Sequence, residues 1–273
     1  MIKADYHLHS IFSGDGLFPL EDMVKKGIEL ELKSICITEH MDYFYKDEAG
    51  NISDEFILET DSYKKELFRL KEKYADKIEL LFGIELGLHP TVVSKNEALI
   101  NSYPFDFVIG SSHMCHDSDP YFPVFYENRT DKEAYREYFL SLMENAQGFS
   151  NYDVYGHLDY VVRYGKTKNK DYRYHDYQDI FDNLLRYLIE HGKGIECNTG
   201  GLNPKYQLGT TNPCPEIIKR YKELGGEIIT IGSDAHRPEH MCYGFETASD
   251  ILKDCGFRYY TVFKNRKPEF LPL

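Results

Sequence analysis

The sequence predicts an α/β protein whose parallel strands roll up into one barrel-like domain. Two patterns alternate about seven or eight times along the chain: a short β-branched or aromatic run, then a segment with helical spacing of apolar residues. The chain has 273 residues, and α/β barrels of about 250 residues commonly form a single domain. Because no linker rich in Pro, Gly or Ser interrupts the alternation, we expect one domain over residues 1–273.

The strands are expected where short apolar runs would be buried beneath covering helices. In chain order these runs are Ile2–Tyr6, Ser34–Thr38, Ile78–Ile84, Phe105–Ile109, Val154–Tyr155, Ile195, Ile228–Ile231 and Tyr259–Phe263.

Amphipathic helices are expected between these strands, for example over residues 20–28 and 177–188, where apolar residues recur with helical spacing. Thr130 and Glu133 have the spacing of a capping box, which predicts a helix from about Asp131 to Gln147. Glycines follow three of the apolar helical runs, where a left-handed residue ends a helix at little steric cost; they are Gly192, Gly225 and Gly256.

Composition excludes several classes of function. Lys and Arg total 32 against 45 Asp and Glu, a formal net charge of -13, and no basic run stands out, so a broad nucleic-acid surface is not expected. No apolar stretch approaches the ~18 to 20 residues that cross a bilayer, and the first residues show no signal region. The six cysteines contain no C-x-x-C pair, which favours reduced thiols and a cytoplasmic location.

Side chains that bind metals follow most of the predicted strands. In chain order they are His7 and His9, His40, Glu85, His113, His157, and Asp234 with His236. The C-terminal ends of all strands in a closed parallel barrel open on one face, so these scattered residues are expected to converge there. The spacing of His7 with His9, repeated by Asp234 with His236, places both members of each pair on the same side of a strand.

Each of these residues has a structural interpretation when it is taken alone. A single histidine is commonly a buried, hydrogen-bonded core residue, and Glu85 could form a salt bridge at the rim of the barrel. Asp15, in Ser13-Gly14-Asp15-Gly16, has the composition of a turn, although its loop follows the first strand and reaches the same face. That so many metal-binding side chains follow predicted strands is much harder to explain by chance than any one of them alone.

The sequence resembles the PHP (polymerase and histidinol phosphatase) superfamily, and in particular its histidinol-phosphate phosphatase branch. The resemblance runs along nearly the whole chain, and no polymerase module is attached. The blocks that carry it are Asp5-Tyr6-His7-Leu8-His9-Ser10, Thr38-Glu39-His40, Gly83-Ile84-Glu85, Ser112-His113, Gly156-His157-Leu158-Asp159 and Gly232-Ser233-Asp234-Ala235-His236.

The resemblance implies a distorted (β/α)7 TIM-like barrel that holds three divalent metal ions. By position, the first ion would be bound by His7, His9, Glu85 and Asp234, the second by Glu85, His113 and His157, and the third by Asp15, His40 and His236. The superfamily varies between His and an acidic residue at the place of Asp15. Histidine and carboxylate ligands are compatible with Zn, Mn or Fe, so the sequence does not fix the metal.

The resemblance also implies a metal-dependent phosphatase that hydrolyses L-histidinol phosphate in histidine biosynthesis. With their carboxylate ligands the three ions would carry a net charge of about +3, which suits a phosphate dianion. A hydroxide bridging the first two ions, its pKa lowered towards about 7, would attack phosphorus in line. The expected catalytic residues are Glu85, which bridges the ions, and Asp234 and His236, which compete with a metal-bound water as donor to the leaving alkoxide.

Residues near the strand ends are expected to contact the substrate. Arg163 could bind the phosphate with bidentate geometry, with a salt bridge at the rim as the alternative, and His116 and Arg237 could assist it. Glu196 and Asn198 could recognise an amino or imidazole group.

Two other functions remain open on sequence grounds. A phosphoesterase of the same superfamily could act on nucleotides or on nucleic-acid ends, and a barrel with an idle site could have a structural or regulatory role. The filled ligand positions count against the idle barrel, and the missing basic stripe counts against long nucleic acids. The expected partner is a small phosphate monoester; oligomeric state cannot be predicted without an exposed patch to locate.

Overall fold

A computed structural model describes residues 2–273 and forms a parallel barrel of seven strands, with a short extra strand beside it. The ring order is β1 (Ala4–Asp5), β2 (Ser34–Ile37), β4 (Glu79–Gly87), β5 (Phe107–Ser111), β6 (Val154–Tyr155), β7 (Gly194–Asn198) and β8 (Ile229–Gly232), and β3 (His40–Met41) pairs with β4. The ring closes where Tyr6 N–H donates to the Ile231 carbonyl at 3.1 Å and Asp234 N–H donates to the His7 carbonyl at 2.9 Å. The (β/α)7 prediction is therefore confirmed.

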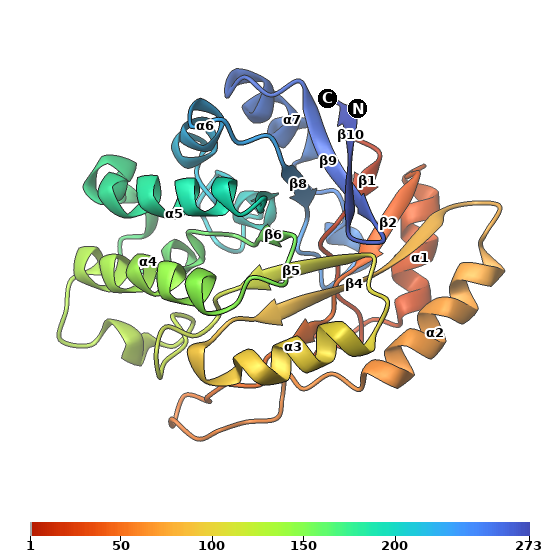
Figure 1. Ribbon diagram of the computed structural model, residues 1–273, viewed down its shortest axis with the longest axis horizontal. Helices are drawn as coiled ribbons and strands as arrows, with labels where there is room; N and C mark the ends of the chain where they lie inside the picture. The colour runs from red at the N-terminus through yellow and green to blue at the C-terminus, as the bar shows by residue number, and fades with distance from the viewer. Residues whose placement is uncertain (1) are drawn as a thin grey trace.

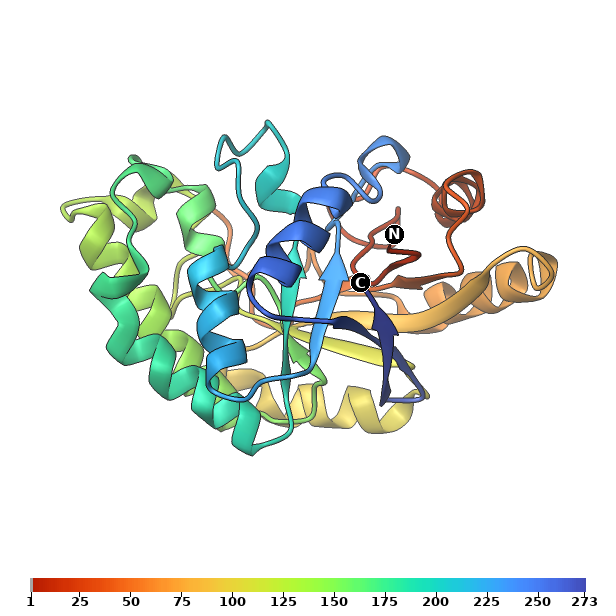
Figure 2. The ribbon, with the colours of Figure 1, turned by 90° about the horizontal axis from the view of Figure 1, so that it is seen from above.

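The helices lie outside the strands (Figures 1 and 2). They are α1 (Leu20–Glu29), α2 (Thr60–Lys73), α3 (Val93–Ser102), α4 (Asp131–Gly148), α5 (Gln178–Glu190), α6 (Pro215–Glu223) and α7 (Phe245–Asp254). Short 3-10 turns span Pro90–Val92, Pro123–Tyr126, Tyr160–Arg163, Lys168–Lys170, Tyr174–Tyr177, Gly200–Leu202 and Pro238–His240. Helices adjacent in sequence pack side by side from α4 to α7, as expected when right-handed crossovers wrap a barrel.

The predicted helix boundaries are confirmed where the sequence carried a chemical signal. Thr130 caps α4: its hydroxyl accepts from Glu133 N–H at 3.3 Å, and the Glu133 carboxylate accepts from Thr130 N–H at 2.8 Å. Gly192 and Gly225 follow α5 and α6 with φ values of 67° and 98°, in the left-handed region that favours glycine. The apolar faces of α4 and α5 meet at Phe139 and Phe181, whose ring centroids are 4.7 Å apart.

The last predicted strand does not join the barrel. Residues 259–263 lie in β9 (Tyr259–Lys264), which pairs antiparallel with β10 (Lys267–Pro272) in a separate two-stranded sheet. Asn265 and Arg266 form the two-residue turn between β9 and β10, and their φ values of 51° and 63° suit such a hairpin turn. β10 is absent from the strands expected from the sequence, and its Pro268 and Pro272 count against a strand anywhere except at a sheet edge.

This hairpin covers the N-terminal end of the barrel (Figure 1). Asn265 N–H donates to Asp106 just before β5, and Arg266 Nε donates to Asp153 just before β6 at 2.6 Å. Phe263 stacks on Phe107 of β5, with ring centroids 5.1 Å apart. The opposite, C-terminal end of the strands is therefore the end that stays open for a site.

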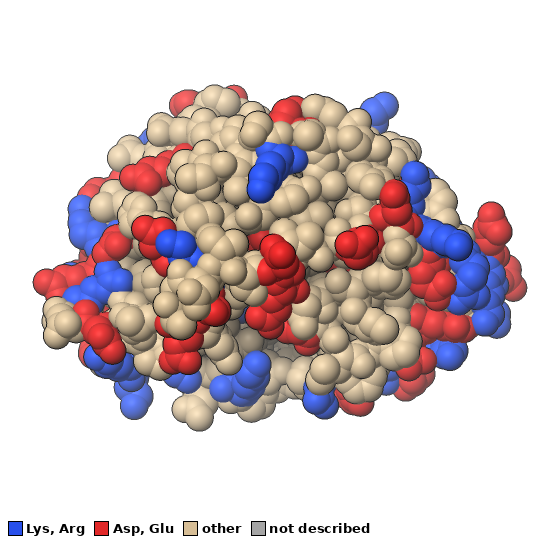
Figure 3. All heavy atoms as spheres, turned by 90° about the horizontal axis from the view of Figure 1, so that it is seen from below, with Lys and Arg blue, Asp and Glu red and all other residues tan. Residues whose placement is uncertain are grey.

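The sequence led us to expect neither a broad basic surface nor a segment that crosses a bilayer, and two observations bear on these expectations. Acidic and basic side chains are interspersed on the face drawn in Figure 3. Among residues 2–273, none of the helices combines the length and the apolar character that a bilayer crossing requires.

Candidate metal centre

Apart from Asp15, which lies in the loop after β1, the predicted metal ligands lie in strands near their C-terminal ends or just beyond those ends. His7 and His9 follow β1, His113 follows β5, His157 follows β6, and Asp234 and His236 follow β8. His40 lies in β3, where the pairing register sets it directly beside Glu85 of β4. The parallel register thus brings residues from both ends and the middle of the chain to one place, as the sequence analysis predicted.

Glu85 is the centre of this cluster and is fully buried. Its Oε2 atom lies 3.1 Å from His7 Nε2, 3.4 Å from His9 Nε2 and 2.8 Å from His40 Nδ1. Its Oε1 atom lies 3.2 Å from His113 Nε2 and 2.9 Å from His157 Nε2. One carboxylate therefore faces two groups of imidazoles, which is the arrangement that a bridging ligand requires.

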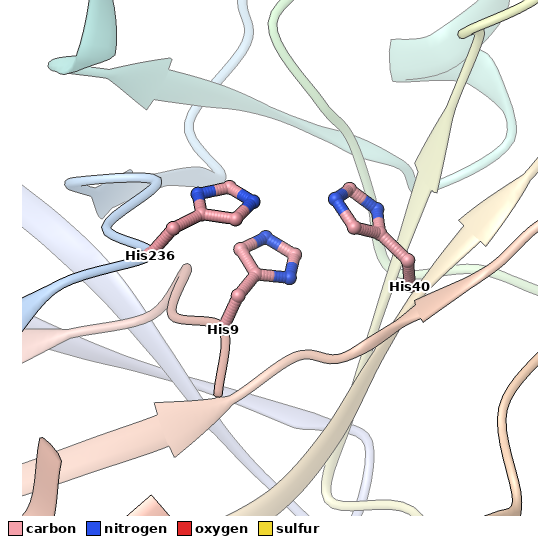
Figure 4. Close-up of side chains that lie close together, drawn as sticks. All are labelled: His9, His40 and His236. Carbon is pink, nitrogen blue, oxygen red and sulfur yellow. The ribbon is translucent and has the colours of Figure 1, made fainter. Parts of the chain in front are cut away.

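A third group of imidazoles lies beside the first. The rings of His9 and His40 have centroids 4.1 Å apart, those of His9 and His236 are 4.2 Å apart, and the three rings face one another (Figure 4). Asp15 lies at the same place, with Oδ2 3.0 Å from His236 Nε2 and Oδ1 3.7 Å from His40 Nε2. Asp15 is thus a member of the cluster as well as a turn residue.

Asp234 completes the first group. Its Oδ1 atom lies 3.7 Å from His7 Nε2 and 3.6 Å from His9 Nε2. Its backbone has a φ of 55°, a left-handed conformation that Asp adopts more readily than most residues. Strained backbone of this kind is concentrated at functional sites, where the surrounding structure holds it in place.

Unpaired buried atoms indicate that the cluster suits metal ions. Although some of these atoms lie close together, His7 Nε2, His9 Nε2, Glu85 Oε2 and His236 Nε2 are buried and make no hydrogen bond of acceptable geometry within residues 2–273. An unpaired buried polar atom costs about 1–3 kcal/mol, so such atoms need a further partner. Nitrogen and carboxylate ligands at these separations fit Zn, Mn or Fe.

The electrostatics of the cluster also require positive charge near its carboxylates. Burial alone would raise the pKa of Glu85, but His7, His113 and His40 hold it well below its usual range. Burial opposes the charge of Asp234 too, yet His7 and Arg163 keep its pKa well below the usual value. Divalent ions meet the same electrostatic need, since they are the largest local charges in a metal site.

Glu196 and Asn198, which were expected to contact the substrate, lie behind the cluster. Glu196 is 1% exposed, its Oε1 lies 2.6 Å from His7 Nδ1, and its Oε2 accepts from His157 N–H at 3.0 Å. Asn198 is buried, and its amide donates to Glu196 at 3.1 Å. Both side chains bind other residues of the site, Glu196 through His7 and His157, and Asn198 through Glu196 and Arg163. A carboxylate on the second ring nitrogen fixes the tautomer of a ligating histidine.

Arg163 lies in the site as predicted, in a buried position beside the cluster. Its Nη1 donates to Asp234 at 2.9 Å, its Nη2 to Asn198 at 2.9 Å and its Nε to Asn212 at 2.8 Å. A guanidinium has five N–H groups, so these three bonds fix its plane and leave two donors. Arg163 also lines the recess of about 90 Å³ that the metal cluster borders.

The two other predicted substrate residues lie further out. Arg237 borders a wider cavity of about 570 Å³ that shares Asp234 and His236 with the inner recess, so it stays a candidate contact. His116 does not line either cavity; it is half exposed and lies 4.0 Å from Glu137 of α4. The turn after His113, in which His116 has a φ of 52°, carries this side chain away from both cavities.

Two acidic residues of the site were missed by the sequence analysis. Asp42 Oδ1 lies 2.9 Å from His113 Nδ1, a contact of the same kind as that of Glu196 with His7 Nδ1. Its position two residues after His40 repeats the spacing of the other ligand pairs, and that signal could have found it. Asp119 lines both cavities from an irregular loop, where no periodic pattern identifies it.

Comparison with known proteins finds matches that span most of this chain. Residues 5–200 match the family model of the PHP domain. A histidinol-phosphatase of Lactococcus lactis is 34% identical over 98% of this chain and 96% of its own, and a probable histidinol-phosphatase of Clostridium acetobutylicum is 32% identical over 93% and 94%. The crystal structure of histidinol phosphate phosphatase from Lactococcus lactis, complexed with zinc, L-histidinol and phosphate, superimposes with a TM-score of 0.88 at 33% identity, covering 98% of each chain.

Proposed function

The chain belongs to the PHP domain family, and from this premise we propose that it hydrolyses L-histidinol phosphate to L-histidinol and phosphate. The observation that carries the proposal is the convergence of imidazoles and carboxylates on Glu85 at the open end of the barrel. The relatives of this chain that are named histidinol-phosphatases support the choice of substrate. The reaction is a step of histidine biosynthesis, which we place in the cytoplasm; the free thiols of all six cysteines support that location.

We treat residues 1–273 as one PHP phosphoesterase domain. The family model matches residues 5–200, whereas Asp234 and His236 lie beyond that segment. β8 supports the extension, because it pairs with β7 and brings these two residues back to His7 and His9.

We further propose that the cluster holds three divalent ions, in the ligand sets expected from the sequence. These sets are His7, His9, Glu85 and Asp234 for the first ion, Glu85, His113 and His157 for the second, and Asp15, His40 and His236 for the third. When bound, such ions lower the pKa of water and neutralise phosphate charge. Zinc in the related crystal structure makes zinc the first candidate, with manganese and iron as the others.

The chain's own residues would hold and orient the phosphate. Arg163 presents its two free N–H donors in the fixed plane set by Asp234, Asn198 and Asn212, which suits two phosphate oxygens at once. Its guanidinium lies 5.5 Å from the ring centroid of Tyr160 and 5.0 Å from that of Tyr206, so two aromatic faces limit its movement. Preorganised donors of this kind need no reorganisation as charge develops.

A side-by-side kinetic comparison tests the proposal. The kcat/KM values of the metal-loaded protein would be measured for L-histidinol phosphate, for nucleoside monophosphates and for short oligonucleotides with a terminal phosphate. A Glu85→Gln variant purified in the same way would report any contaminating phosphatase. We expect L-histidinol phosphate to be the best substrate by at least about tenfold. If it proved the poorest, the substrate assignment would fail in favour of the nucleotide-directed alternative; loss of all turnover with metal bound would favour the idle barrel.

A further inference from the structure

This inference rests on the proposed function and concerns the end of the substrate away from the phosphate. We propose that Asp119 forms a subsite that binds a protonated nitrogen of the substrate, either its ammonium group or its imidazolium ring. Asp119 is not one of the metal ligands expected from the sequence, and it lies six residues after His113, beyond the turn that carries His116 away from the site.

The Asp119 carboxylate is buried and held in place, with one oxygen left free. The residue is 4% exposed and lines both the inner recess and the wider cavity. Its Oδ1 atom accepts from Tyr121 N–H at 2.7 Å and from the Tyr160 hydroxyl at 3.4 Å. Its Oδ2 atom has no hydrogen bond to any residue of 2–273. A rigid acceptor therefore borders the space where the substrate would lie.

No cationic side chain of residues 2–273 forms a salt bridge with Asp119. Burying a carboxylate without such a partner is costly, and this burial raises the pKa of Asp119 to about 7, against the lowering effect of the Tyr121 N–H bond. Arg163, which borders the same recess, is instead bound to Asp234. A cation from the substrate would supply the missing partner.

The charges along the cavity match a substrate with two differently charged ends. The metal ligands and Arg163 form the end that attracts a phosphate dianion, and Asp119 supplies a negative charge in the adjoining space. Histidinol phosphate carries an ammonium group and an imidazole ring on the carbon chain that bears its phosphate. Aromatic side chains line the same recess as Asp119, and aromatic rings suit a flat or cationic group; they are Tyr45, Phe56, Tyr160, Tyr164 and Tyr206.

Asp42, the other carboxylate in the recess that is not a predicted metal ligand, is less suited to this role. Its Oδ1 atom already lies 2.9 Å from His113 Nδ1, so it orients a predicted metal ligand. Asp119 makes no such contact with the histidine cluster, and its loss should leave metal binding intact.

The test compares four phosphate esters with the metal-loaded protein and its Asp119→Asn variant. The esters are L-histidinol phosphate, an analogue without the amino group (3-(imidazol-4-yl)propyl phosphate), an analogue without the imidazole (L-phenylalaninol phosphate), and 4-nitrophenyl phosphate, which has no cationic nitrogen. Asn keeps the acceptor for Tyr121 N–H, so the variant is expected to fold. Asp117→Asn is the matched control, because Asp117 is exposed and pairs with Lys46 outside both cavities.

We expect Asp119→Asn to lower kcat/KM for L-histidinol phosphate by about 10- to 100-fold, as for the loss of a hydrogen bond to a charged group. Turnover of 4-nitrophenyl phosphate and metal content should change less than about twofold. If the variant lowers kcat/KM for the phenylalaninol ester but not for the imidazolylpropyl ester, Asp119 binds the ammonium group. The reverse result assigns the imidazolium ring to Asp119. An equal loss with all four esters, or no loss with L-histidinol phosphate, overturns the subsite.

A binding measurement separates recognition from catalysis. Calorimetric titration with L-histidinol should show weaker binding to Asp119→Asn than to the unmodified protein, whereas titration with inorganic phosphate should not differ. Asp119→Ser, which keeps a hydroxyl acceptor, repeats the test should the Asn variant fail to fold. A wild-type protein that prefers 4-nitrophenyl phosphate would contradict the proposed function itself, whereas a preference for L-histidinol phosphate that survives in Asp119→Asn contradicts only the subsite.

Discussion

Glu196→Gln replaces one oxygen behind the metal cluster by an NH2 group. The variant distinguishes a residue that orients metal ligands from one that contacts the substrate. Glu196 accepts at both oxygens, from His7 Nδ1 at 2.6 Å, His157 N–H at 3.0 Å and the Asn198 amide at 3.1 Å. A glutamine side chain has one acceptor oxygen, so its NH2 group must face one of these donors. Loss of a charge-assisted bond costs about 1.5–3 kcal/mol, and loss of the partner of a ligating histidine typically costs 10- to 100-fold in metal affinity.

We therefore expect Glu196→Gln to weaken metal binding by about 10- to 100-fold, equivalent to about 1.4–2.8 kcal/mol. Activity measured against free metal concentration, buffered with a chelator, should recover at higher metal with little change in KM. Glu190→Gln, at an exposed position at the end of α5, provides the control. Unchanged metal affinity together with a raised KM would refute this reasoning and restore the direct substrate contact that the sequence suggested.

Four further predictions follow from individual contacts. Glu85→Gln removes the carboxylate shared by the imidazole groups, so elemental analysis should show loss of bound metal, and activity should fall by more than about 100-fold; full turnover with metal retained would contradict the bridging role. Arg163→Lys keeps the charge but loses the fixed plane, so kcat/KM should fall by about 10- to 100-fold with metal content unchanged. Burial raises the pKa of Asp119 to about 7, so the folded protein retains a proton that the unfolded chain releases near pH 4. The contribution of Asp119 to stability should therefore fall as pH rises from about 4 to 7. Over that range Asp119→Asn should gain up to about 4 kcal/mol relative to the unmodified protein, measured by urea unfolding at pH 4 and pH 8. Thr130→Ala removes the cap of α4 and should lower the free energy of unfolding by about 1 kcal/mol without changing metal content, whereas an unchanged melting temperature would count against the capping box.

The barrel and most of the candidate metal cluster could be predicted because their signals are local or follow from topology. The capping box at Thr130 is a contact between residues three apart, so it is visible in the sequence. The clustering of His7 with Asp234 is not local, but parallel strands in a closed barrel leave their C-terminal ends on one face, so element order was sufficient. The β9–β10 hairpin escaped prediction because its prolines obscure the second strand and because strand propensity does not reveal a strand's partner.

The sequence by itself determined which residue types reach the open end of the barrel, since chain order and strand polarity decide that. Only the tertiary structure decided which of them face the cavity and which lie behind the histidines. Glu196 and Asp119 are both acidic and both close to the site, yet one orients His7 and the other borders the cavity with a free oxygen. That difference depends on side-chain direction and on loop path, which are set by packing between elements distant in sequence.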